Sequence, residues 1–235
     1  MRIGSTVLLK DQLCVQSYEW NTIRPLGALQ GVLDSLEEYQ CDEVAIIRPV
    51  RQNDTLKSFQ RDIQVIKALK TMTPISFGGG IRSLEHISLL KGLPIERIIF
   101  SSAFLEKQTE LITLAKDLFG HQAIKCLLPV SVQKGEVHVY HSSAGRYIPL
   151  STVDTQFIDE LANEIVLFDT DHEGCSDQFD WSIIEEVPFA AEKLILCGGV
   201  GKKTPCIARQ NNIASVLIDN KVLHQEYSIL EYKNA

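Results

Sequence analysis

A glycine-rich stretch, Ser76–Glu85 (SFGGGIRSLE), has the residue types of a phosphate-binding loop. Three glycines follow a short apolar run and precede Ser83-Leu84-Glu85, which is a typical helix start. Glycine lets the backbone approach a ligand closely and present bare N–H groups to it, and a following helix adds its positive dipole end. The stretch therefore predicts a phosphate cradle, although an ordinary strand-to-helix turn would have the same pattern.

A second glycine loop indicates that the chain repeats this device. Gly198–Lys202 (GGVGK) matches Gly79–Ser83 (GGIRS), and Asn163–Asp171 (NEIVLFDTD) matches Asp42–Val50 (DEVAIIRPV) at nearly the same separation. Two such matches predict two related halves with their glycine loops facing one another, an arrangement that would hold a ligand with a phosphate at each end. The residues expected to bind phosphate are Gly79, Gly80, Ser101, Ser102, Gly198, Gly199, Asn220 and Lys221.

These loops must be positioned by short β-branched runs that alternate with amphipathic segments, a pattern typical of βα units. The expected strands are Ile3–Leu9, Glu43–Arg48, Pro74–Phe77, Arg97–Phe100, Ala123–Leu128, Glu164–Phe168, Leu194–Cys197 and Val216–Ile218. The expected helices are Gly27–Glu38, Leu56–Leu69, Leu84–Leu90, Lys107–Phe119, Val153–Ala162, Trp181–Glu186, Thr204–Gln210 and Gln225–Tyr232. This alternation predicts a closed (βα)₈ barrel, built as two (βα)₄ halves in one domain over residues 1–235, with a doubly wound open sheet as the alternative.

Two hairpin-like patches interrupt the alternation. Cys14–Trp20 follows the first expected strand, and Glu136–Leu150 follows the fifth, so that each patch comes after the first strand of a half. We expect both at the C-terminal face of the barrel, where barrel enzymes have their active sites.

Composition and charge narrow the class of protein. A formal net charge of −7 gives no indication of binding to nucleic acid or to an anionic membrane. The N-terminal segment lacks the pattern of a signal peptide and no apolar run is long enough to span a bilayer, so we expect a cytoplasmic protein. The cysteines are scattered without a CxxC pair, which predicts reduced thiols rather than disulfides or zinc, and no motif predicts a cofactor. They are Cys14, Cys41, Cys126, Cys175, Cys197 and Cys206.

Six segments, in chain order, resemble the cyclase subunit of imidazole glycerol phosphate synthase, HisF. They are MRIGSTVLLKDQLCVQ, CDEVAIIRPV, SFGGGIRSLE, RIIFSSAFLE, NEIVLFDTDHEGC and LCGGVGK. The resemblance implies a barrel that receives ammonia from a partner glutaminase at its N-terminal face. It also implies two catalytic aspartates at the C-terminal face, one at the end of the first strand and one at the end of the fifth, acting as general acid and base.

The chain departs from the family pattern where the chemistry should occur. Leu8 and Pro129 occupy the two positions at which the resemblance implies aspartates, and neither side chain can transfer a proton. General acid–base catalysis contributes about 10²–10⁴-fold, so the ancestral cyclisation should be nearly abolished. Candidate replacements for the lost pair are Asp11, Asp171 and Glu173. The other positions at the mouth that differ are Gln16, Arg48, Ser101 and Phe168.

The opposite end of the barrel keeps the family pattern. The resemblance implies a ring of alternating charges that gates ammonia at the strand starts, formed here by Arg2, Glu43, Arg97 and Glu164. Alternating charges around one barrel end can pair and close it, so a purely structural salt-bridge cluster is the alternative. The residues expected beside the ring, facing a docked glutaminase, are Asp42, Glu96 and Gln122. Those expected to line the interior are Ile46, Ile99, Leu127 and Leu167.

A retained gate with a lost acid and base favours a diverged HisF-like barrel. Such a barrel would form a heterodimer with a HisH-like glutaminase and deliver ammonia to an amidotransfer step, for example in surface-sugar biosynthesis. One alternative is a working cyclase of histidine biosynthesis with relocated acid–base groups. Another is a non-catalytic scaffold that binds a phosphorylated sugar.

Overall fold

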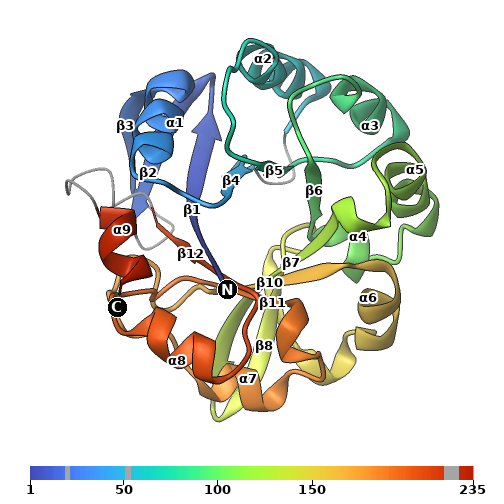
Figure 1. Ribbon diagram of the computed structural model, residues 1–235. Helices are drawn as coiled ribbons and strands as arrows, with labels where there is room; N and C mark the ends of the chain where they lie inside the picture. The colour runs from blue at the N-terminus through green and yellow to red at the C-terminus, as the bar shows by residue number, and fades with distance from the viewer. Residues whose placement is uncertain (19–21, 51–53, 220–227, 235) are drawn as a thin grey trace.

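The computed structural model describes residues 1–18, 22–50, 54–219 and 228–234, and its centre is a closed barrel of eight parallel strands inside a ring of helices (Figure 1). β12 pairs with β1, and β7 pairs with β10, so the ring of strands is complete. The closed barrel was predicted, and the open doubly wound sheet is excluded. In spatial order the barrel strands are β1 (Arg2–Lys10), β4 (Val44–Ile47), β5 (Ile75–Gly78), β6 (Arg97–Phe100), β7 (Ile124–Gln133), β10 (Glu164–Asp169), β11 (Leu194–Cys197) and β12 (Ser215–Ile218).

The helices form because each has an apolar stripe that can be buried against the barrel. α1 buries Leu29, Val32, Leu33 and Leu36, which recur at the spacing of one helix face. At the start of α2 the Thr55 side chain accepts a hydrogen bond from the Ser58 N–H, which satisfies one of the free N–H groups of the first turn. The α-helices are α1 (Leu29–Glu38), α2 (Leu56–Lys67), α3 (Leu84–Leu90), α4 (Ser102–Leu105), α5 (Thr109–Phe119), α6 (Thr155–Leu161), α7 (Ser182–Glu186), α8 (Thr204–Gln210) and α9 (Ser228–Lys233). The short 3₁₀ helices are η1 (His121–Ala123), η2 (Leu150–Thr152) and η3 (Ala191–Lys193).

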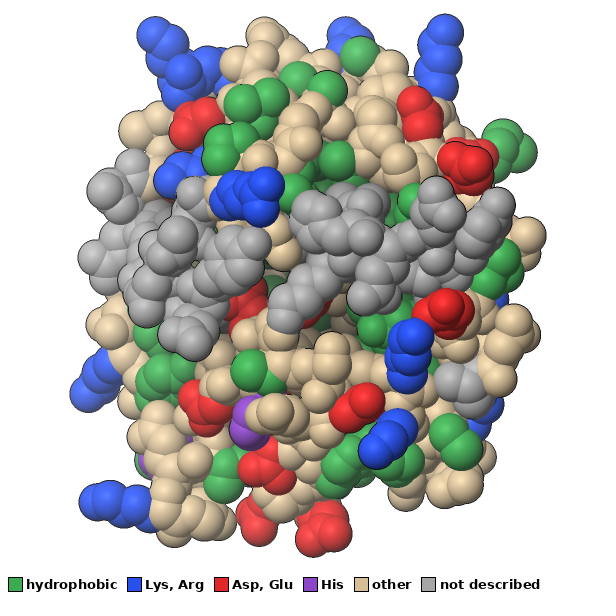
Figure 2. Space-filling model, turned by 90° about the vertical axis from the view of Figure 1, so that its left-hand side faces the viewer, with side chains coloured by type: hydrophobic (Ala, Val, Ile, Leu, Met, Phe, Trp, Pro, Cys, Tyr) green, Lys and Arg blue, Asp and Glu red, His purple; other side chains and the backbone are tan. Residues whose placement is uncertain are grey.

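The expected strands and helices have counterparts among the described residues, and the short helix α4 was not predicted. Residues 225–227 of the last expected helix lie outside the described residues. Over the described residues, no helix has the length and apolar character needed to cross a membrane. On the face over α1, α8 and α9, Figure 2 shows basic and acidic side chains interspersed among the residues it colours.

Both predicted hairpins are present, with one difference at the first. β2 (Leu13–Tyr18) folds back on β1 and pairs with β3 (Thr22–Ala28), a strand that the sequence did not predict. Its sequence, TIRPLGA, contains Pro and Gly, which are unfavourable inside a strand, and Gly27 was assigned to the following helix. The second hairpin consists of β8 (Glu136–His141) and β9 (Arg146–Pro149), and β8 extends the sheet from β7.

Two apolar clusters stabilise the barrel. The residues of the inner cluster differ from those expected to line the barrel interior. The larger cluster lies between the strands and the helices, and it contains Ile46 and Leu167. The prediction that these two residues line the interior was therefore wrong, because side chains alternate along a strand and the assignment was one residue out of phase. The inner cluster consists of Ala45, Ile99, Val166, Ile195, Cys197 and Leu217, with Ile47, Leu127 and Phe168 packed against it.

The two glycine loops make the same contact in the two halves. A Cβ on Gly79 would lie 2.2 Å from the Arg48 carbonyl oxygen, and a Cβ on Gly198 would lie 2.1 Å from the Asp169 carbonyl oxygen. Arg48 and Asp169 occupy matching places in the two repeated segments, so each loop presses against the end of the strand before it. Both glycines also have φ values in the left-handed region, 96° for Gly79 and 78° for Gly198.

Candidate functional site

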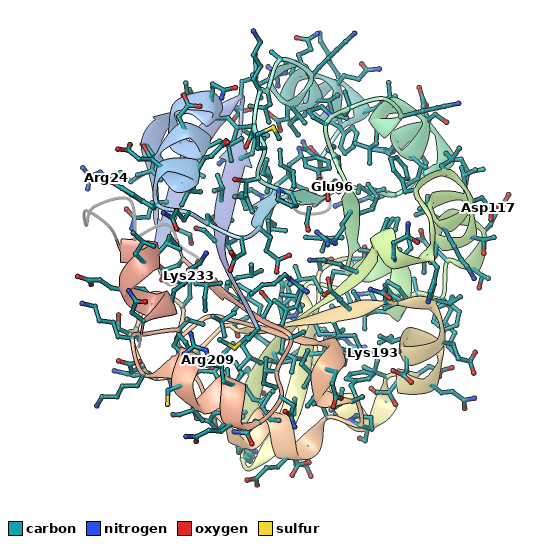
Figure 3. All side chains as sticks on the ribbon, viewed as in Figure 1. Arg24, Glu96, Asp117, Lys193, Arg209 and Lys233 are labelled. Atoms are coloured by element: carbon teal, nitrogen blue, oxygen red, sulfur yellow. The ribbon has the colours of Figure 1, made fainter. Side chains whose placement is uncertain are left out.

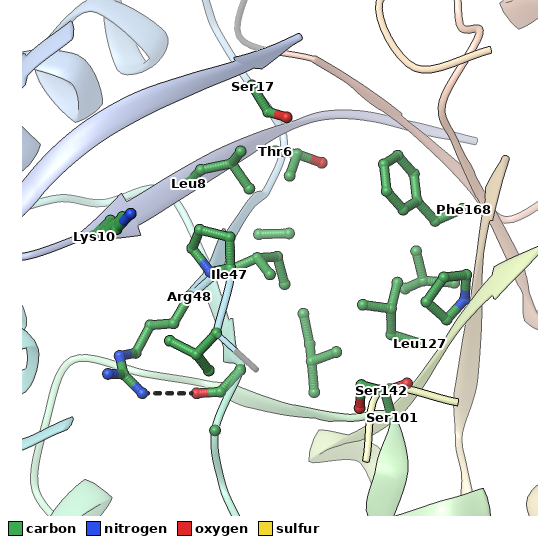
Figure 4. Close-up of a pocket in the computed structure, with 18 of the residues that line it drawn as sticks. Thr6, Leu8, Lys10, Ser17, Ile47, Arg48, Ser101, Leu127, Ser142 and Phe168 are labelled. Carbon is green, nitrogen blue, oxygen red and sulfur yellow. Dashed lines mark hydrogen bonds between the residues drawn. The ribbon is translucent and has the colours of Figure 1, made fainter. Parts of the chain in front are cut away.

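A cavity of about 600 Å³ opens at the C-terminal ends of the barrel strands. Figure 4 shows Leu8, Ile47, Leu127 and Phe168 projecting around it from β1, β4, β7 and β10. All four side chains are only partly buried, because their inner ends face the cavity. The C-terminal ends of parallel strands meet here, so the cavity lies where barrel enzymes bind their substrates.

Leu8 and Pro129, the positions implied for the aspartates, both line this cavity. The side chains at these two strand ends are therefore apolar. Of the candidate replacements, Asp11 and Glu173 line the cavity, whereas Asp171 does not. Asp171 instead accepts a hydrogen bond of 2.7 Å from the Ser131 hydroxyl, beside the second hairpin.

The two predicted phosphate loops differ in their access to the cavity. Gly79 and Gly80 line it together with Ser101 and Ser102, whereas Gly198 and Gly199 are not part of its lining. The second loop packs against its own chain, since a Cβ on Gly199 would lie 2.5 Å from the Phe179 nitrogen. The other two residues expected to bind phosphate, Asn220 and Lys221, lie outside the described residues.

The hydroxyl group of Ser101 makes no hydrogen bond to the described residues. Its Oγ is buried and has no hydrogen-bond partner among the described residues. Buried hydroxyl groups are nearly always hydrogen-bonded, so a hydroxyl of this kind at a cavity wall is available to a bound water or ligand. Ser101 therefore lies where a ligand held by the first glycine loop would meet it.

Arg48 is the buried charge that supports the first glycine loop. Its guanidinium pairs with Asp54 through contacts of 2.8 and 3.0 Å and with Asp62 at 2.7 Å, and it donates a 3.2 Å hydrogen bond to the Gly79 carbonyl. Burial lowers the pKa of Arg48, but the hydrogen bonds and charges of Asp54 and Asp62 outweigh it and raise the pKa. The sequence singled out Arg48 as an unusual residue at the mouth, but its partners on α2 and the preceding loop were not foreseen.

The acidic cluster at the end of β10 divides into two parts. Asp169 is buried and accepts hydrogen bonds from the His172 Nδ1, at 2.7 Å, and from the Asp180 N–H, at 2.9 Å. Glu173 instead faces the cavity and accepts a 3.2 Å hydrogen bond from Ser17 on β2. The Asp169–His172 pair thus organises the loop after β10, and Glu173 is the member of the cluster that lines the cavity.

Cys197 lies at the cavity floor and is a poor nucleophile. Burial raises the pKa of its thiol to about 12, and its Sγ lies 3.4 Å from the Thr6 hydroxyl. The thiol therefore stays protonated near neutral pH, as expected for a small buried residue.

The opposite end of the barrel is closed by a ring of charges. Lys125 Nζ lies 2.9 Å from Glu43 Oε2 and 3.1 Å from Glu164 Oε2, and Arg2 Nε lies 2.9 Å from Glu43 Oε1. Arg2 also pairs with Glu164, and Ser215 donates a 2.6 Å hydrogen bond to Glu43. We call Arg2, Glu43, Lys125 and Glu164 the basal ring.

Lys125 is a cation of the basal ring that the sequence analysis did not include, whereas it did include Arg97. No ion pair joins Arg97 to a carboxylate in the described part of the chain, and its Nη1 is buried without a hydrogen-bond partner there. Arg97 begins β6 as expected, and its role in a gate stays a prediction, whereas Lys125 reaches both glutamates from the neighbouring strand. Its sequence signal was a lysine inside the apolar run Ala123–Leu128, which is unusual for a barrel strand.

Glu43 is the centre of the basal ring. Burial raises its pKa, but the opposing charges of Lys125 and Arg2 and the hydrogen bond from Ser215 outweigh burial and lower the pKa to about 2. The side chain is therefore ionised across the physiological pH range.

Two of the three residues expected at a glutaminase interface are exposed, and the third is partly exposed. Glu96, labelled in Figure 3, directly precedes β6, and Gln122 lies within η1 just before β7. Asp42 is partly buried and accepts a 2.8 Å hydrogen bond from the Ile3 N–H and a 2.6 Å contact from Lys233 Nζ. These residues surround the closed end of the barrel, but Asp42 also has a structural role in tying α9 to β1.

Comparison with known proteins places the chain in a family. Residues 2–227 match the model of the family described as "Histidine biosynthesis protein". A putative imidazole glycerol phosphate synthase subunit hisF2 of Campylobacter jejuni is 27% identical over 233 residues, covering 95% of this chain and 89% of the relative. A protein of the same description from Vibrio vulnificus is 23% identical and covers 86% of this chain and 75% of the relative. The imidazole glycerol phosphate synthase subunit HisF of an Exiguobacterium species is 24% identical over 98% of this chain and 90% of its own length. With its closed barrel, its paired glycine loops and this match, the chain belongs to the histidine biosynthesis protein family and is a HisF-like member of it.

Proposed function

We propose that this chain pairs with a HisH-like glutaminase as a heterodimer and passes ammonia through its barrel, having lost the ancestral cyclase chemistry. The observation that carries the proposal is the position of the basal ring directly below an apolar interior that opens into the cavity. The proposed acceptor is the substrate of an amidotransfer step, as in surface-sugar biosynthesis, and the proposed location is the cytoplasm.

The arrangement of side chains supports a route for ammonia from the basal ring at the N-terminal face to the cavity at the C-terminal face. Ala45, Ile99 and Leu217 belong to the inner apolar cluster and also line the cavity. The cavity floor and the barrel core are therefore the same layer of side chains, and the basal ring is the layer beneath them. Neutral ammonia crosses apolar surroundings at little cost, whereas ammonium does not, so a charged ring above a glutaminase would admit the neutral molecule when the ring opens.

The loss of cyclase chemistry is inferred from the cavity wall. Leu8 and Pro129 line the cavity where the resemblance implies acid and base. Relatives in Vibrio vulnificus, Campylobacter jejuni and Pseudomonas aeruginosa carry the description putative imidazole glycerol phosphate synthase subunit hisF2.

The test is reconstitution with a HisH-like glutaminase from the same source. Complex formation is followed by size-exclusion chromatography, and glutamate release is measured with and without this chain. We expect a one-to-one complex and a stimulated glutaminase. Glu96→Arg reverses an exposed charge beside the basal ring and should weaken the complex. Glu136→Arg, which reverses an exposed charge at the start of β8, is the matched control and should leave the complex unchanged. A chain that neither binds nor stimulates the glutaminase would refute the proposal.

A working cyclase is the second candidate, because Asp11 and Glu173 do line the cavity. Asp11 is exposed at the turn after β1, 3.8 Å from Arg61, and Glu173 is bonded to Ser17. A histidine auxotroph that lacks the cyclase separates the two candidates. We expect no growth when this chain is expressed, and rescue that depends on Asp11 and Glu173 would establish the cyclase instead. A chain that fails both tests would fit the third reading, a non-catalytic scaffold that binds a phosphorylated sugar.

A further inference from the structure

The cavity differs in character from a site for a polar ligand with two phosphates. Its middle is formed by Leu8, Ile47, Leu127 and Phe168, which leave apolar surface facing the cavity (Figure 4). Cavities of several hundred Å³ with apolar walls and a few polar groups are typical of small-molecule sites, and such walls favour a ligand with an apolar body.

Polar residues also line the cavity around this apolar middle, among them Lys10, Arg82 and Tyr140. On the side of β5 and β6, the cavity is lined by Gly79, Gly80, Ser101 and Ser102, and the Ser101 Oγ is buried without a partner in the described part of the chain. Backbone N–H groups of a glycine loop and serine hydroxyls are suitable donors to one phosphate group.

The described residues on the side of β10, β11 and β12 differ from those on the side of β5 and β6. Glu173 and Asp219 line the cavity there, and both are acidic. Gly198 and Gly199, the residues of the second loop, lie outside the lining and pack against Asp169 and Phe179. Among the residues that the structure describes, the second glycine loop therefore presents no donor for a phosphate to this cavity.

From this distribution we infer that the cavity binds a small molecule with one phosphate group and a compact apolar body, such as an aromatic or hydrocarbon ring system. The phosphate lies against the first glycine loop and Ser101, and the apolar body lies between Leu8, Ile47, Leu127 and Phe168. This inference does not depend on the proposed pairing with a glutaminase, because it concerns the opposite face of the barrel.

Four probes separate the contributions of the two parts of such a ligand. Calorimetric titration of the purified chain with 1-naphthyl phosphate measures the phosphate and the apolar body together. 1-Naphthol carries the apolar body alone, ribose 5-phosphate carries one phosphate on a polar body, and ribulose 1,5-bisphosphate carries two phosphates on a polar body. We expect 1-naphthyl phosphate to bind roughly tenfold or more tightly than each of the other three.

Variants then assign the binding to the cavity. Phe168→Thr should weaken 1-naphthyl phosphate about tenfold and leave ribose 5-phosphate within about twofold, since it removes apolar wall without touching the phosphate donors. Ile47→Thr, on a different strand, makes the same comparison if Phe168→Thr fails to fold. Ser101→Ala should weaken 1-naphthyl phosphate but not 1-naphthol. Phe119→Thr, at another partly buried phenylalanine that does not line the cavity, is the matched control.

The inference is overturned by any of three results. Tighter binding of the bisphosphate than of 1-naphthyl phosphate would show that the family's two-phosphate site persists. Unchanged binding of 1-naphthyl phosphate to folded Phe168→Thr and Ile47→Thr would place the probe elsewhere. Failure of all four probes to bind would show that the cavity takes no ligand of this class.

Discussion

The ammonium group of Lys125 lies 2.9 Å from Oε2 of Glu43, and both side chains are almost fully buried at the N-terminal end of the barrel. A buried lysine is tolerated only when its charge is compensated. Glu43, which directly precedes β4, and Glu164, the first residue of β10, supply the opposing charges. The contact makes Lys125 the inner cation of the basal ring. Its side chain is 2% exposed, whereas that of Arg2 is 35% exposed.

Removal of the Lys125 charge should destabilise the fold strongly. Lys125→Met leaves Glu43 and Glu164 with one buried cation fewer, so we expect the free energy of unfolding to fall by about 3 kcal/mol in urea titrations. Lys193→Met is the control, because Lys193 pairs with Asp159 at the surface at 2.8 Å and should cost less than about 1 kcal/mol. Equal losses in the two variants would contradict the buried role of Lys125.

Glu43 should make stability depend on acid pH. Its pKa falls from 4.5 to about 2 on folding, so the unfolded chain binds a proton more readily than the folded one. The stabilisation is therefore fully present above about pH 4.5 and is lost as the pH falls through 2. In urea titrations between pH 7 and pH 2, Glu43→Gln should be less stable at pH 7 and should show a shallower loss below pH 4.5 than the wild type. Glu136→Gln, a charge removal at an exposed site, should follow the wild-type profile.

The crowding of the first glycine loop can be separated from its backbone conformation. Gly79 and Gly92 both have left-handed φ values, 96° and 77°, but a Cβ on Gly79 would meet the Arg48 carbonyl at 2.2 Å, whereas a Cβ on Gly92 would meet nothing within 4 Å. Gly92→Ala should cost about 1 kcal/mol of unfolding free energy from backbone strain alone. Gly79→Ala should cost about 3 kcal/mol or more, because a steric clash is added. If both variants melt at the same temperature, the close approach of the loop to Arg48 is not needed for stability.

Thiol reactivity should follow burial. Cys14, Cys41 and Cys197 are buried, and burial raises each pKa to about 12. Cys126 is buried too, and burial raises the pKa of its thiol well above the ordinary value. At pH 8 we expect Ellman's reagent to modify the exposed Cys206 and the partly exposed Cys175 rapidly and the other four thiols only after unfolding. Rapid modification of a third thiol in the native protein would show that one of the buried positions opens.

The sequence alone determined the barrel and its internal repeat. Strands such as Arg97–Phe100 and Leu194–Cys197 were predicted residue for residue, because buried β-branched runs between amphipathic helices are a local signal. The matching glycine loops were also visible, since glycine is required wherever φ is positive and a backbone approaches closely. The replacements at Leu8 and Pro129 could be identified in the same way, by position within a resembling motif.

The tertiary structure alone decided which side chains meet. The barrel interior is lined by Ala45 and Val166, whereas Ile46 and Leu167 face the helices. A strand in which every residue is apolar does not reveal which alternate residues point inward. Lys125 is a member of the basal ring because two glutamates far away in sequence pair with it. The first glycine loop reaches the cavity and the second does not, since Phe179 fills the space beside Gly199. Contacts of this kind join distant parts of the chain, and their geometry exists only once the barrel has closed.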